Sequence, residues 1–349
     1  MRASVDVNDV EEFRPEVMTV ADDEVVVYRG AERSVLVDLE PDSDVDLGFR
    51  TVHTLPRRGE LLATFTTVND VHFGETVCGR VGGADFATFS VEPSATPYPV
   101  VMNAGAVAEM STVEPAAVVV KGDLTSTGVI EEYEQFRAMY DEAFGDRLLH
   151  VRGNHESFHE LDVAAWPTQE RTLPGVILAV LDTSRDRTVN GRISVEQLEW
   201  LDELGARADR PVMVFGHHPV WKPESEPRSD ECFGLIPDDT EALVRVFGRR
   251  PRLAAYVAGH THRNDVAWFA DAPGVPFAEV SCVKDFPGSW VEYRVYEDLI
   301  LHIHRRIGTS DALEWSERTR GMFAGTYVPY ALGRLAHRSF AIDLAGRTR

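Results

Sequence analysis

The chain has 349 residues, of which 44% are hydrophobic and 26% are charged, values that are ordinary for a globular protein. This length allows one large domain with an appendage, or two modest domains, and a sizeable core. The formal net charge of −22 at pH 7 argues against binding to nucleic-acid polymers or anionic membranes. A small anionic substrate stays possible because bound metal cations can reverse the local field.

The three cysteines, Cys78, Cys232 and Cys282, are odd in number and far apart in the sequence. They predict neither a disulfide framework nor a paired zinc site, and a reducing compartment fits them best. The first residues lack the apolar segment of a secretory signal, and no apolar run reaches the length of a membrane span. We therefore expect a cytoplasmic protein without a membrane segment.

The N-terminal part of the chain predicts a small β unit. Residues 1–16 are acidic and are expected to be loose. Residues 17–58 contain three short β-rich runs, with turns between them at Gly30 and Pro41. The interpretation that we favour is a β extension that covers the edge of a larger sheet.

From residue 61 onward, apolar runs alternate with polar clusters. Five runs are short and rich in Val, Leu and Ala, which is typical of buried strands. Each run precedes a cluster of side chains that can bind metals. The runs and their clusters are 62–68 with Asp70 and His72, 117–120 with Asp123, 148–151 with Asn154, His155 and Glu156, 212–215 with His217 and His218, and 254–258 with His260 and His262.

Two stretches between these runs are predicted to be helices. Residues 131–144 place four aromatic side chains near one face, and residues 194–204 open with Ser194 and Gln197 at capping-box spacing. Later strands are predicted at 277–282, 290–296 and 299–305. Alternating strands and helices indicate a layered α/β fold, in which ligands gather beyond the carboxyl ends of the strands.

Taken alone, each cluster has an ordinary structural explanation. Asp70 and His72 could form a plain turn at a strand end, although residues two apart on an extended segment face the same side. Asp123 could cap a helix or make a turn. Each of the two histidine pairs could be structural.

Taken together, the five clusters predict a metal centre. Their combination of His, carboxylate and Asn side chains suits Mn, Fe, Zn or Co better than Ca or Mg, which prefer all-oxygen ligands. The clusters supply seven or more ligands, which is too many for one tetrahedral site. Two neighbouring metals are the simplest interpretation.

The order of the clusters resembles the calcineurin-like metallophosphoesterase family. The matching blocks are Asp70-x-His72, Gly122-Asp123, Gly153-Asn154-His155-Glu156, Gly216-His217-His218 and Gly259-His260-Thr261-His262. The match covers about 61–305, and the last two blocks have the form that is common in bacterial class III cyclic-nucleotide phosphodiesterases. The resemblance implies a four-layer α/β/β/α sandwich, here with the small N-terminal β unit attached.

Carried over to this sequence, the resemblance implies a role for each matching residue. One metal would be held by Asp70, His72 and His262. The other would be held by Asn154, His217 and His260. Asp123 would bridge both metals, and His155 would contact the phosphate and help the leaving group depart.

General chemistry supports this division of roles. A water between two metals loses a proton near neutral pH, and the resulting hydroxide can attack phosphorus. A nearby histidine can donate a proton to the departing alkoxide. Glu156 and His218 would orient the metal ligands from behind, and a purely structural role for them is an equal alternative.

The chain departs from one branch of this family, the purple acid phosphatases. That branch has a Tyr three residues after the bridging Asp, where this chain has Ser126, so an iron–tyrosinate site is not expected. The β unit at 17–58 nevertheless resembles a truncated fibronectin-III-like module of that branch. At roughly forty residues it is too short for a full sandwich.

The sequence says little about the substrate. Arg80, Lys222 and Arg263 are cationic candidates for phosphate contact, and Phe73 and Trp221 could stack on a base or pack against an apolar leaving group. Ordinary surface or core packing is the alternative for each.

Three functions compete on the sequence alone. The first is a phosphodiesterase that acts on a cyclic nucleotide or another small diester. The second is a phosphomonoesterase or a broad-specificity phosphatase, and the third is a non-enzymatic scaffold of the same fold. A scaffold predicts missing ligands, whereas the set in this sequence is complete.

Residues 59–308 are expected to form the catalytic domain, and residues 309–349 a C-terminal tail or lid. The tail is rich in aromatic residues, and we hypothesise that it folds over the active-site mouth or pairs two subunits in a homodimer. These aromatic residues are Trp315, Phe323, Tyr327 and Tyr330.

Overall fold

The computed structural model describes residues 14–80 and 85–345. Most of the N-terminal segment that was predicted to be loose, 1–16, therefore lies outside the described residues. None of the helices in the described part of the chain is long and apolar enough to cross a membrane.

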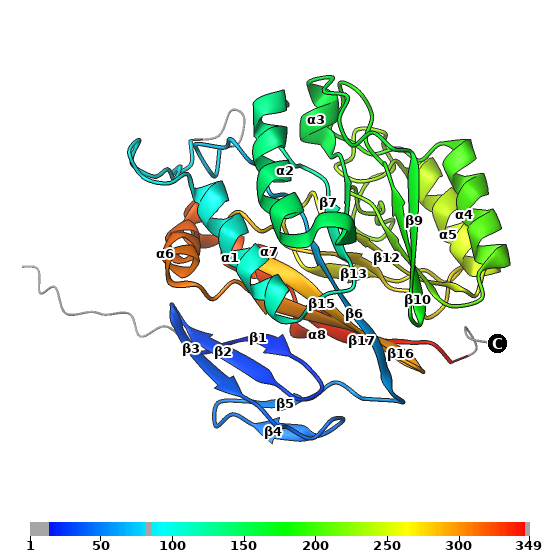
Figure 1. Cartoon of the computed structure of the whole chain (residues 1–349), viewed down its shortest axis with the longest axis horizontal. Coiled ribbons are helices and arrows are strands. Elements are labelled where there is room, and N and C mark those ends of the chain that lie inside the picture. The colour runs from blue at the N-terminus through cyan, green and yellow to red at the C-terminus, as the bar shows by residue number, and fades with distance from the viewer. Residues whose placement is uncertain (1–13, 81–84, 346–349) are drawn as a thin grey trace, which may run out of the picture.

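Two six-stranded sheets form the centre of the molecule (Figure 1). The first has the strand order β17-β16-β15-β6-β7-β8, in which β6, β7 and β8 are parallel and the other three strands are antiparallel to their neighbours. Its strands are β6 (Leu61–Val68), β7 (Val118–Lys121), β8 (Leu148–Val151), β15 (Ser289–Tyr296), β16 (Leu299–Arg306) and β17 (Ser339–Asp343).

The second sheet has the order β13-β14-β12-β11-β10-β9. Its four inner strands are parallel, and its two edge strands are antiparallel to their neighbours. Its strands are β9 (Thr168–Leu173), β10 (Val176–Leu181), β11 (Val212–Phe215), β12 (Leu253–Ala258), β13 (Asp265–Ala267) and β14 (Phe277–Glu279).

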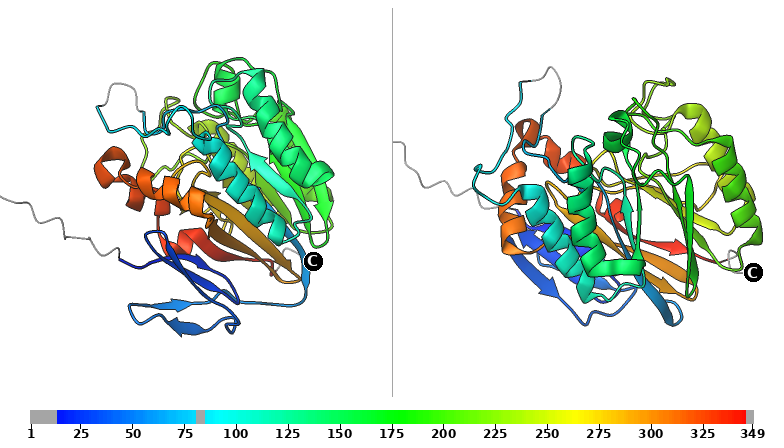
Figure 2. Two further views of the ribbon diagram at one scale, coloured as in Figure 1. Left: turned by 60° about the vertical axis from the view of Figure 1, so that its left-hand side comes forward. Right: turned by 45° about the horizontal axis from the view of Figure 1, so that its top comes forward.

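Helices cover the outer faces of both sheets, which gives the four layers that the family resemblance implies. On the first sheet lie α1 (Tyr98–Thr112), α2 (Ile130–Phe144) and α6 (Ser310–Thr319), and on the second lie α4 (Val195–Arg207) and α5 (Pro237–Arg249) (Figures 1 and 2). Side chains of both sheets, such as Phe65, Val119 and Phe215, form a continuous apolar layer between them. The predicted fold class is confirmed.

The local sequence explains several of these elements. Helix α4 begins with the predicted capping box, because the Gln197 backbone N–H donates to the Ser194 hydroxyl and the Ser194 N–H donates to the Gln197 side-chain oxygen. Strands β11 and β12 are buried along their whole length, as their uninterrupted apolar runs predict. The sequence analysis did not predict α1, α5, β9 or β10.

The N-terminal β unit covers a sheet face rather than a sheet edge. It contains β1 (Glu16–Val20), β2 (Val25–Arg29) and β3 (Glu32–Leu36), followed by the hairpin of β4 (Asp44–Asp46) and β5 (Thr51–His53). Its apolar side chains pack on Leu299, Leu301 and Ile303 of β16, which is not an edge strand. The expectation of an edge cover therefore needs this correction: pairing with β17 already protects that side of β16.

The C-terminal segment returns to the first sheet. After α6 it forms two short helices, α7 (Tyr327–Leu332) and α8 (Leu335–Arg338), with a 3-10 turn (Met322–Gly325) before α7. It ends in β17, which pairs antiparallel with β16. This segment is thus tied at its far end to the central architecture (Figure 2).

Acid should destabilise the fold through His304 of β16. This side chain is fully buried, and its Nδ1 lies 3.2 Å from the Met18 carbonyl oxygen, to which it donates. Burial lowers the pKa of His304 to about 3, and the charge of Arg338 acts in the same direction. As the pH falls, the unfolded chain protonates this group first. Its contribution to the free energy of unfolding should therefore be fully present above about pH 6.5 and should fall toward pH 3, by at most about 1.4 kcal/mol per pH unit.

Urea unfolding at several values between pH 7 and pH 4 measures this dependence. His304→Asn keeps a donor for the Met18 carbonyl and removes the titrating ring, so the variant should lose stability less steeply than the natural protein. His53→Asn, which alters an exposed histidine, should not flatten the curve. Parallel curves for the natural protein and His304→Asn would contradict the prediction.

Candidate metal centre

The ligand-type side chains meet where the parallel strands of both sheets end. Asp70 and His72 follow β6, and Asp123 follows β7. Asn154 begins the short helix α3 (Asn154–Phe158) after β8. His217 follows β11, and the His260–His262 segment follows β12. Packing the two sheets face to face brings these five strand ends to one place.

Five of these residues have a left-handed backbone, which is uncommon for residues other than glycine. The φ angles are 54° at Asp70, 48° at His72, 51° at Asp123, 69° at His260 and 54° at His262. Such positions are costly and persist where the surrounding structure enforces them, which is frequent at functional sites. Here they turn side chains from different strands toward a common centre.

Two glycines allow the loops to approach each other closely. A Cβ atom on Gly153 would lie 2.2 Å from Oδ1 of Asp123, and one on Gly259 would lie 2.6 Å from Oδ2 of Asp70. No side chain fits at either place without displacing a carboxylate. The glycines before Asn154 and His260 are therefore required for the close packing of these loops against Asp123 and Asp70.

The first ligand group contains Asp70, His72 and His262. One ligand atom from each lies within 4.8 Å of the others. Oδ1 of Asp70 is 3.4 Å from Nε2 of His262. Neither ring nitrogen of His72 has a hydrogen-bond partner among the described residues, although the side chain is buried.

The second group contains Asn154, His217 and His260. His217 donates from Nδ1 to the Lys121 carbonyl oxygen at 2.8 Å, which leaves Nε2 facing the site, 3.0 Å from Oδ1 of Asn154. The His260 ring is 5.1 Å from the His217 ring between centroids. Within the described part of the chain, the buried Nε2 of His260 has no hydrogen-bond partner.

Asp123 lies between the two groups. Its Oδ1 is 3.3 Å from Nε2 of His217, and its Oδ2 is 3.5 Å from Nε2 of His72. The carboxylate is almost fully buried and also accepts a hydrogen bond from the His155 backbone N–H at 3.0 Å. Each oxygen of this one carboxylate thus faces a different ligand group.

The electrostatics of the centre keep its carboxylates ionised and two of its imidazoles, those of His72 and His260, neutral. Burial alone would raise the pKa of Asp123, but the adjacent His217 and His155 hold it well below its usual value. Burial, reinforced by the charge of His155, lowers the pKa of His72 well below 6.5. Burial, reinforced by His217, lowers the pKa of His260 to about 4. Burial alone would also lower the pKa of His217, but the charge of Asp123 raises it to about 9, and the pKa of His262 is likewise raised. Neutral imidazole and ionised carboxylate are the forms that bind metal ions.

The donor set fits transition-metal ions. Two buried carboxylates, one amide oxygen and several imidazole nitrogens converge, and buried ring nitrogens of His72 and His260 lack hydrogen-bond partners among the described residues. An unpaired buried polar atom is costly, and a bound cation removes that cost. Mixed nitrogen and oxygen donors suit Mn, Fe, Zn or Co.

His155 stands beside these groups and is accessible from outside. It donates from Nδ1 to the Ser126 carbonyl oxygen at 2.6 Å, which leaves Nε2 4.0 Å from Oδ2 of Asp123. Its side chain is 35% exposed, whereas those of Asp123 and His72 are almost fully buried. A substrate can therefore reach this ring directly.

Glu156 connects two of the ligand loops. Its Oε1 accepts hydrogen bonds from the backbone N–H and the hydroxyl of Thr125, both at 2.6 Å, and its Oε2 accepts from the Gly153 N–H at 2.6 Å. Because Thr125 and Gly153 lie close to Asp123 and Asn154 in the sequence, this buried side chain holds both loops in register.

His218 lies beside two of the proposed ligands, His217 and His260, and is close enough to be a ligand itself. Its Nδ1 is 2.9 Å from the Thr183 hydroxyl oxygen, and its buried Nε2 lacks a hydrogen-bond partner among the described residues. It offers a ligand atom within 4.8 Å of those of His217 and His260. It can therefore orient these two side chains or serve as a further ligand.

Comparison with known proteins identifies the family. The sequence profile described as Calcineurin-like phosphoesterase matches residues 64–264, which is more than half of the chain. The chain belongs to this family. The resemblance stated from the sequence is thereby confirmed.

Curated relatives within this phosphoesterase family match over part of their length. A protein named "Probable glycerophosphodiester phosphodiesterase GpdQ" from Arcobacter nitrofigilis is 29% identical over 169 residues, which cover 43% of this chain and 58% of that protein. A "Probable cyclic nucleotide phosphodiesterase" from Rhodococcus erythropolis is 28% identical over 184 residues, which cover 49% and 59%. The chain thus spans less than two thirds of the length of these relatives.

Solved structures support the same fold. A dimetal phosphatase from Danio rerio superposes with a TM-score of 0.55 at 18% identity, over 71% of this chain and 98% of that one. The purple acid phosphatase PPD1 from yellow lupin superposes with a TM-score of 0.51 at 13% identity, over 89% and 61%. At these identities the likeness concerns the fold alone.

The cationic candidates for phosphate contact are engaged with carboxylates or lie away from the cavity in this chain. Arg263 donates from Nε to Glu279 at 2.8 Å, and Lys222 forms ion pairs with Glu279 and Asp265. Arg80 is exposed and does not occur among the described residues that line the cavity beside His260 and His262. Phosphate contact by these three side chains stays a prediction.

The two aromatic candidates for stacking are core residues. Phe73 is 1% exposed and belongs to the apolar cluster under α1 and α2. Trp221 is 6% exposed, and its indole N–H donates to the Pro227 carbonyl oxygen at 3.1 Å. Neither ring offers a free face to a substrate.

Sequence reasoning missed two groups that support the ligands. Asn69 donates to Oδ2 of Asp70 at 2.5 Å, and its own oxygen accepts from Nζ of the buried Lys121 at 2.7 Å. Asp285 places Oδ2 3.8 Å from Nδ1 of His262, and its Oδ1 accepts from the Tyr327 hydroxyl at 2.6 Å. Asn69 adjoins the first cluster, which is a usable signal, whereas nothing near Asp285 in the sequence indicates its role.

Loss of the Asp285 charge should weaken metal binding through His262. A carboxylate behind a ligating imidazole fixes the ring and raises its basicity, and removal of such a partner costs roughly 10–100-fold in metal affinity. Asp285→Asn should show a loss of this size when Mn or Zn is titrated calorimetrically into the apoprotein. Tyr327→Phe, which removes a hydrogen bond to the same carboxylate but keeps its charge, should lose clearly less. Unchanged affinity in Asp285→Asn would refute this role.

Proposed function

We propose that this chain hydrolyses a small phosphodiester at a centre of two transition-metal ions. The observation that carries the proposal is the position of Asp123, whose two oxygens face two separate ligand groups. Asp70, His72 and His262 would hold one ion, and Asn154, His217 and His260 the other. When bound, such a pair supplies Lewis-acid charge for the phosphoryl oxygens and an activated water nucleophile.

The chain's own residues supply the remaining chemistry. His155, oriented by the Ser126 carbonyl oxygen, presents Nε2 toward the centre and would give a proton to the departing oxygen. Asn69 and Glu156 hold the Asp70 and Asp123 loops in place, so the ligands need not reorganise when substrate arrives.

The charge around the centre favours a diester over a monoester. A diester carries one negative charge and a monoester carries up to two at neutral pH. Arg263, which lines the cavity, and Lys222 are both paired with carboxylates, those of Glu279 and Asp265, so neither side chain offers an unshared positive charge to a second phosphate charge. The phosphodiesterase names of the curated relatives agree with this choice, and a cyclic nucleotide is one candidate diester.

Hydrolysis should favour the diester and should depend on Asp123. With Mn, Zn, Fe or Co added in turn, kcat/KM should be higher for bis-p-nitrophenyl phosphate than for p-nitrophenyl phosphate. Asp123→Asn should lower kcat by more than roughly a hundredfold, because a shared charge is lost between two cation sites. Asp141→Asn, a change on the exposed face of α2, should retain the activity. Full turnover by Asp123→Asn, or a clear preference for the monoester, would defeat the proposal.

The role of His155 predicts a dependence on the leaving group. His155→Ala should lower kcat by roughly 10²–10⁴-fold for a cyclic nucleotide, whose leaving alkoxide needs a proton. The loss should be much smaller for bis-p-nitrophenyl phosphate, because p-nitrophenolate departs without one. His159→Ala, in an exposed neighbouring histidine, should leave both rates near those of the natural protein. Equal losses on both substrates would mean that His155 acts by another route.

A further inference from the structure

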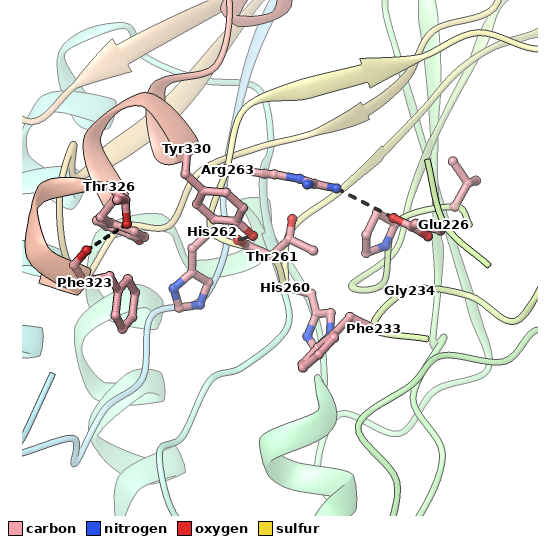
Figure 3. Close-up of a pocket in the computed structure, with 13 residues that line it drawn as sticks. Glu226, Phe233, Gly234, His260, Thr261, His262, Arg263, Phe323, Thr326 and Tyr330 are labelled. Atoms are coloured by element: carbon pink, nitrogen blue, oxygen red, sulfur yellow. Dashed lines mark hydrogen bonds and ion pairs between the residues drawn. The ribbon is translucent and has the colours of Figure 1, made fainter. Parts of the chain in front are cut away.

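A cavity of about 670 Å³ opens beside the proposed metal centre (Figure 3). His260 and His262 contribute to its lining, so the cavity is continuous with the ligand groups. Four further aromatic residues line it, from segments that are far apart in the sequence. These residues are Phe233, Phe323, Tyr327 and Tyr330.

One wall is a fixed row of three aromatic rings from the C-terminal segment. Phe323 and Tyr327 are 5.6 Å apart between ring centroids, and Tyr327 and Tyr330 are 6.1 Å apart. The Tyr330 hydroxyl donates to the Thr261 carbonyl oxygen at 2.8 Å, and the Arg263 guanidinium lies 5.5 Å from the Tyr330 ring centroid. These contacts fix the wall against the loop that carries His260 and His262.

The backbone at this wall is unusual. Phe323 and Ala324 have φ angles of 52° and 56°, and Gly325 follows at 83°. Two successive left-handed residues other than glycine carry strain, which is frequent at ligand sites. The turn directs Phe323 into the lining of the cavity, on the His262 side in Figure 3.

The other side of the cavity presents Phe233. This residue is 71% exposed, and its ring centroid lies 6.1 Å from that of His260. Figure 3 shows it on the His260 side of the cavity, away from Phe323. A large apolar ring that is exposed at the rim of a cavity gains stability when a ligand covers it.

The charged groups of the cavity do not favour a second anion. Arg263 is paired with Glu279, and Glu226 adds a further carboxylate to the lining. Oε1 of Glu226 lies 4.0 Å from the Arg263 guanidinium. Lys222 and Asp265 belong to the same network, so three carboxylates stand against two side-chain cations, and an uncharged group is accommodated better than an anionic one.

We infer that this cavity binds one ester arm of the substrate, and that this arm is an uncharged aromatic ring held between Phe233 and the Phe323–Tyr330 wall. The inference rests on the proposed function, because it concerns the same centre. It adds the substrate class: diesters whose retained, non-leaving arm is a planar, uncharged aryl or heteroaryl group, in preference to diesters whose retained arm is alkyl or carboxylated.

Three diesters with the same leaving group test the inference. Each is a p-nitrophenyl phosphate diester, and the second arm is phenyl, methyl or 4-carboxyphenyl. The phenyl diester should exceed the methyl diester in kcat/KM by roughly tenfold or more, which corresponds to about 1.4 kcal/mol, because the ring is buried and stacked in the cavity. The carboxylated arm should lose most of this advantage because of Glu226.

Binding without turnover gives an independent measure. Diphenylphosphinate and dimethylphosphinate carry one negative charge each and have no ester bond to hydrolyse. Calorimetry with the metal-loaded protein should show tighter binding of diphenylphosphinate by a similar factor.

Variants separate the cavity from the rest of the protein. Phe233→Ala and Tyr330→Ala should each reduce the phenyl-to-methyl ratio several-fold, in kcat/KM and in binding. Phe49→Ala removes a side chain about as exposed as that of Tyr330 from the N-terminal β unit and should leave the ratio and both rates unchanged.

The outcomes distinguish this inference from the proposed function. If the natural protein hydrolyses the phenyl and methyl diesters with equal kcat/KM, or if Phe233→Ala and Tyr330→Ala keep the full ratio, the aryl-arm inference is overturned while the phosphodiesterase proposal stands. If none of the three diesters is hydrolysed with any added metal, the proposed function fails. Stronger binding of diphenylphosphinate would in that case still support an aryl-binding cavity.

Discussion

The Asp123 carboxylate is the constraint on which the rest of the site depends. It is buried, it is close to a second buried carboxylate, Asp70, and each of its oxygens faces a different group of ligand-type side chains. Buried like charges repel strongly and are tolerated when cations lie between them. The converging strand ends, the left-handed backbone at the ligands and the close approach of Gly153 to Asp123 all serve this arrangement. The ligands are therefore positioned by folding, and the free energy needed to bring them together is spent before a metal ion or a substrate binds.

The two packed sheets hold this arrangement in place. Three of the loops that carry the ligands are short extensions of strands that are buried along their whole length, β7, β11 and β12. Strain at a residue such as His260 therefore cannot relax without moving a strand. Glu156 connects two ligand loops, and Asn69 connects Asp70 to Lys121 of β7, through hydrogen bonds of 2.5–2.7 Å. Ligand geometry is thus a property of the sheets as much as of the loops.

The sequence predicted the parts that depend on local pattern. Apolar runs ending in polar clusters located the central parallel strands, and the Ser194–Gln197 spacing located the start of α4. It could not reveal what depends on packing. Helix α1 is largely apolar and lacks a clear polar face, β17 is recognisable only by its pairing with β16, and the importance of Asp285 follows from a fold that brings it behind His262. The sequence shows that Arg263 is a cation, but only the structure shows that this cation is paired with the carboxylate of Glu279.

The C-terminal segment connects the cavity wall to the metal ligands through one carboxylate. Tyr327 belongs to the aromatic wall and donates to Oδ1 of Asp285, while Oδ2 of the same residue lies near His262. On one side of this connection Trp315 of α6 stacks on Tyr98 of α1, with ring centroids 4.1 Å apart, and on the other side β17 pairs with β16. The wall is consequently anchored at both ends. Its shape and the orientation of His262 are not independent, because a shift of Tyr327 alters the hydrogen bonding of the carboxylate that faces the His262 ring.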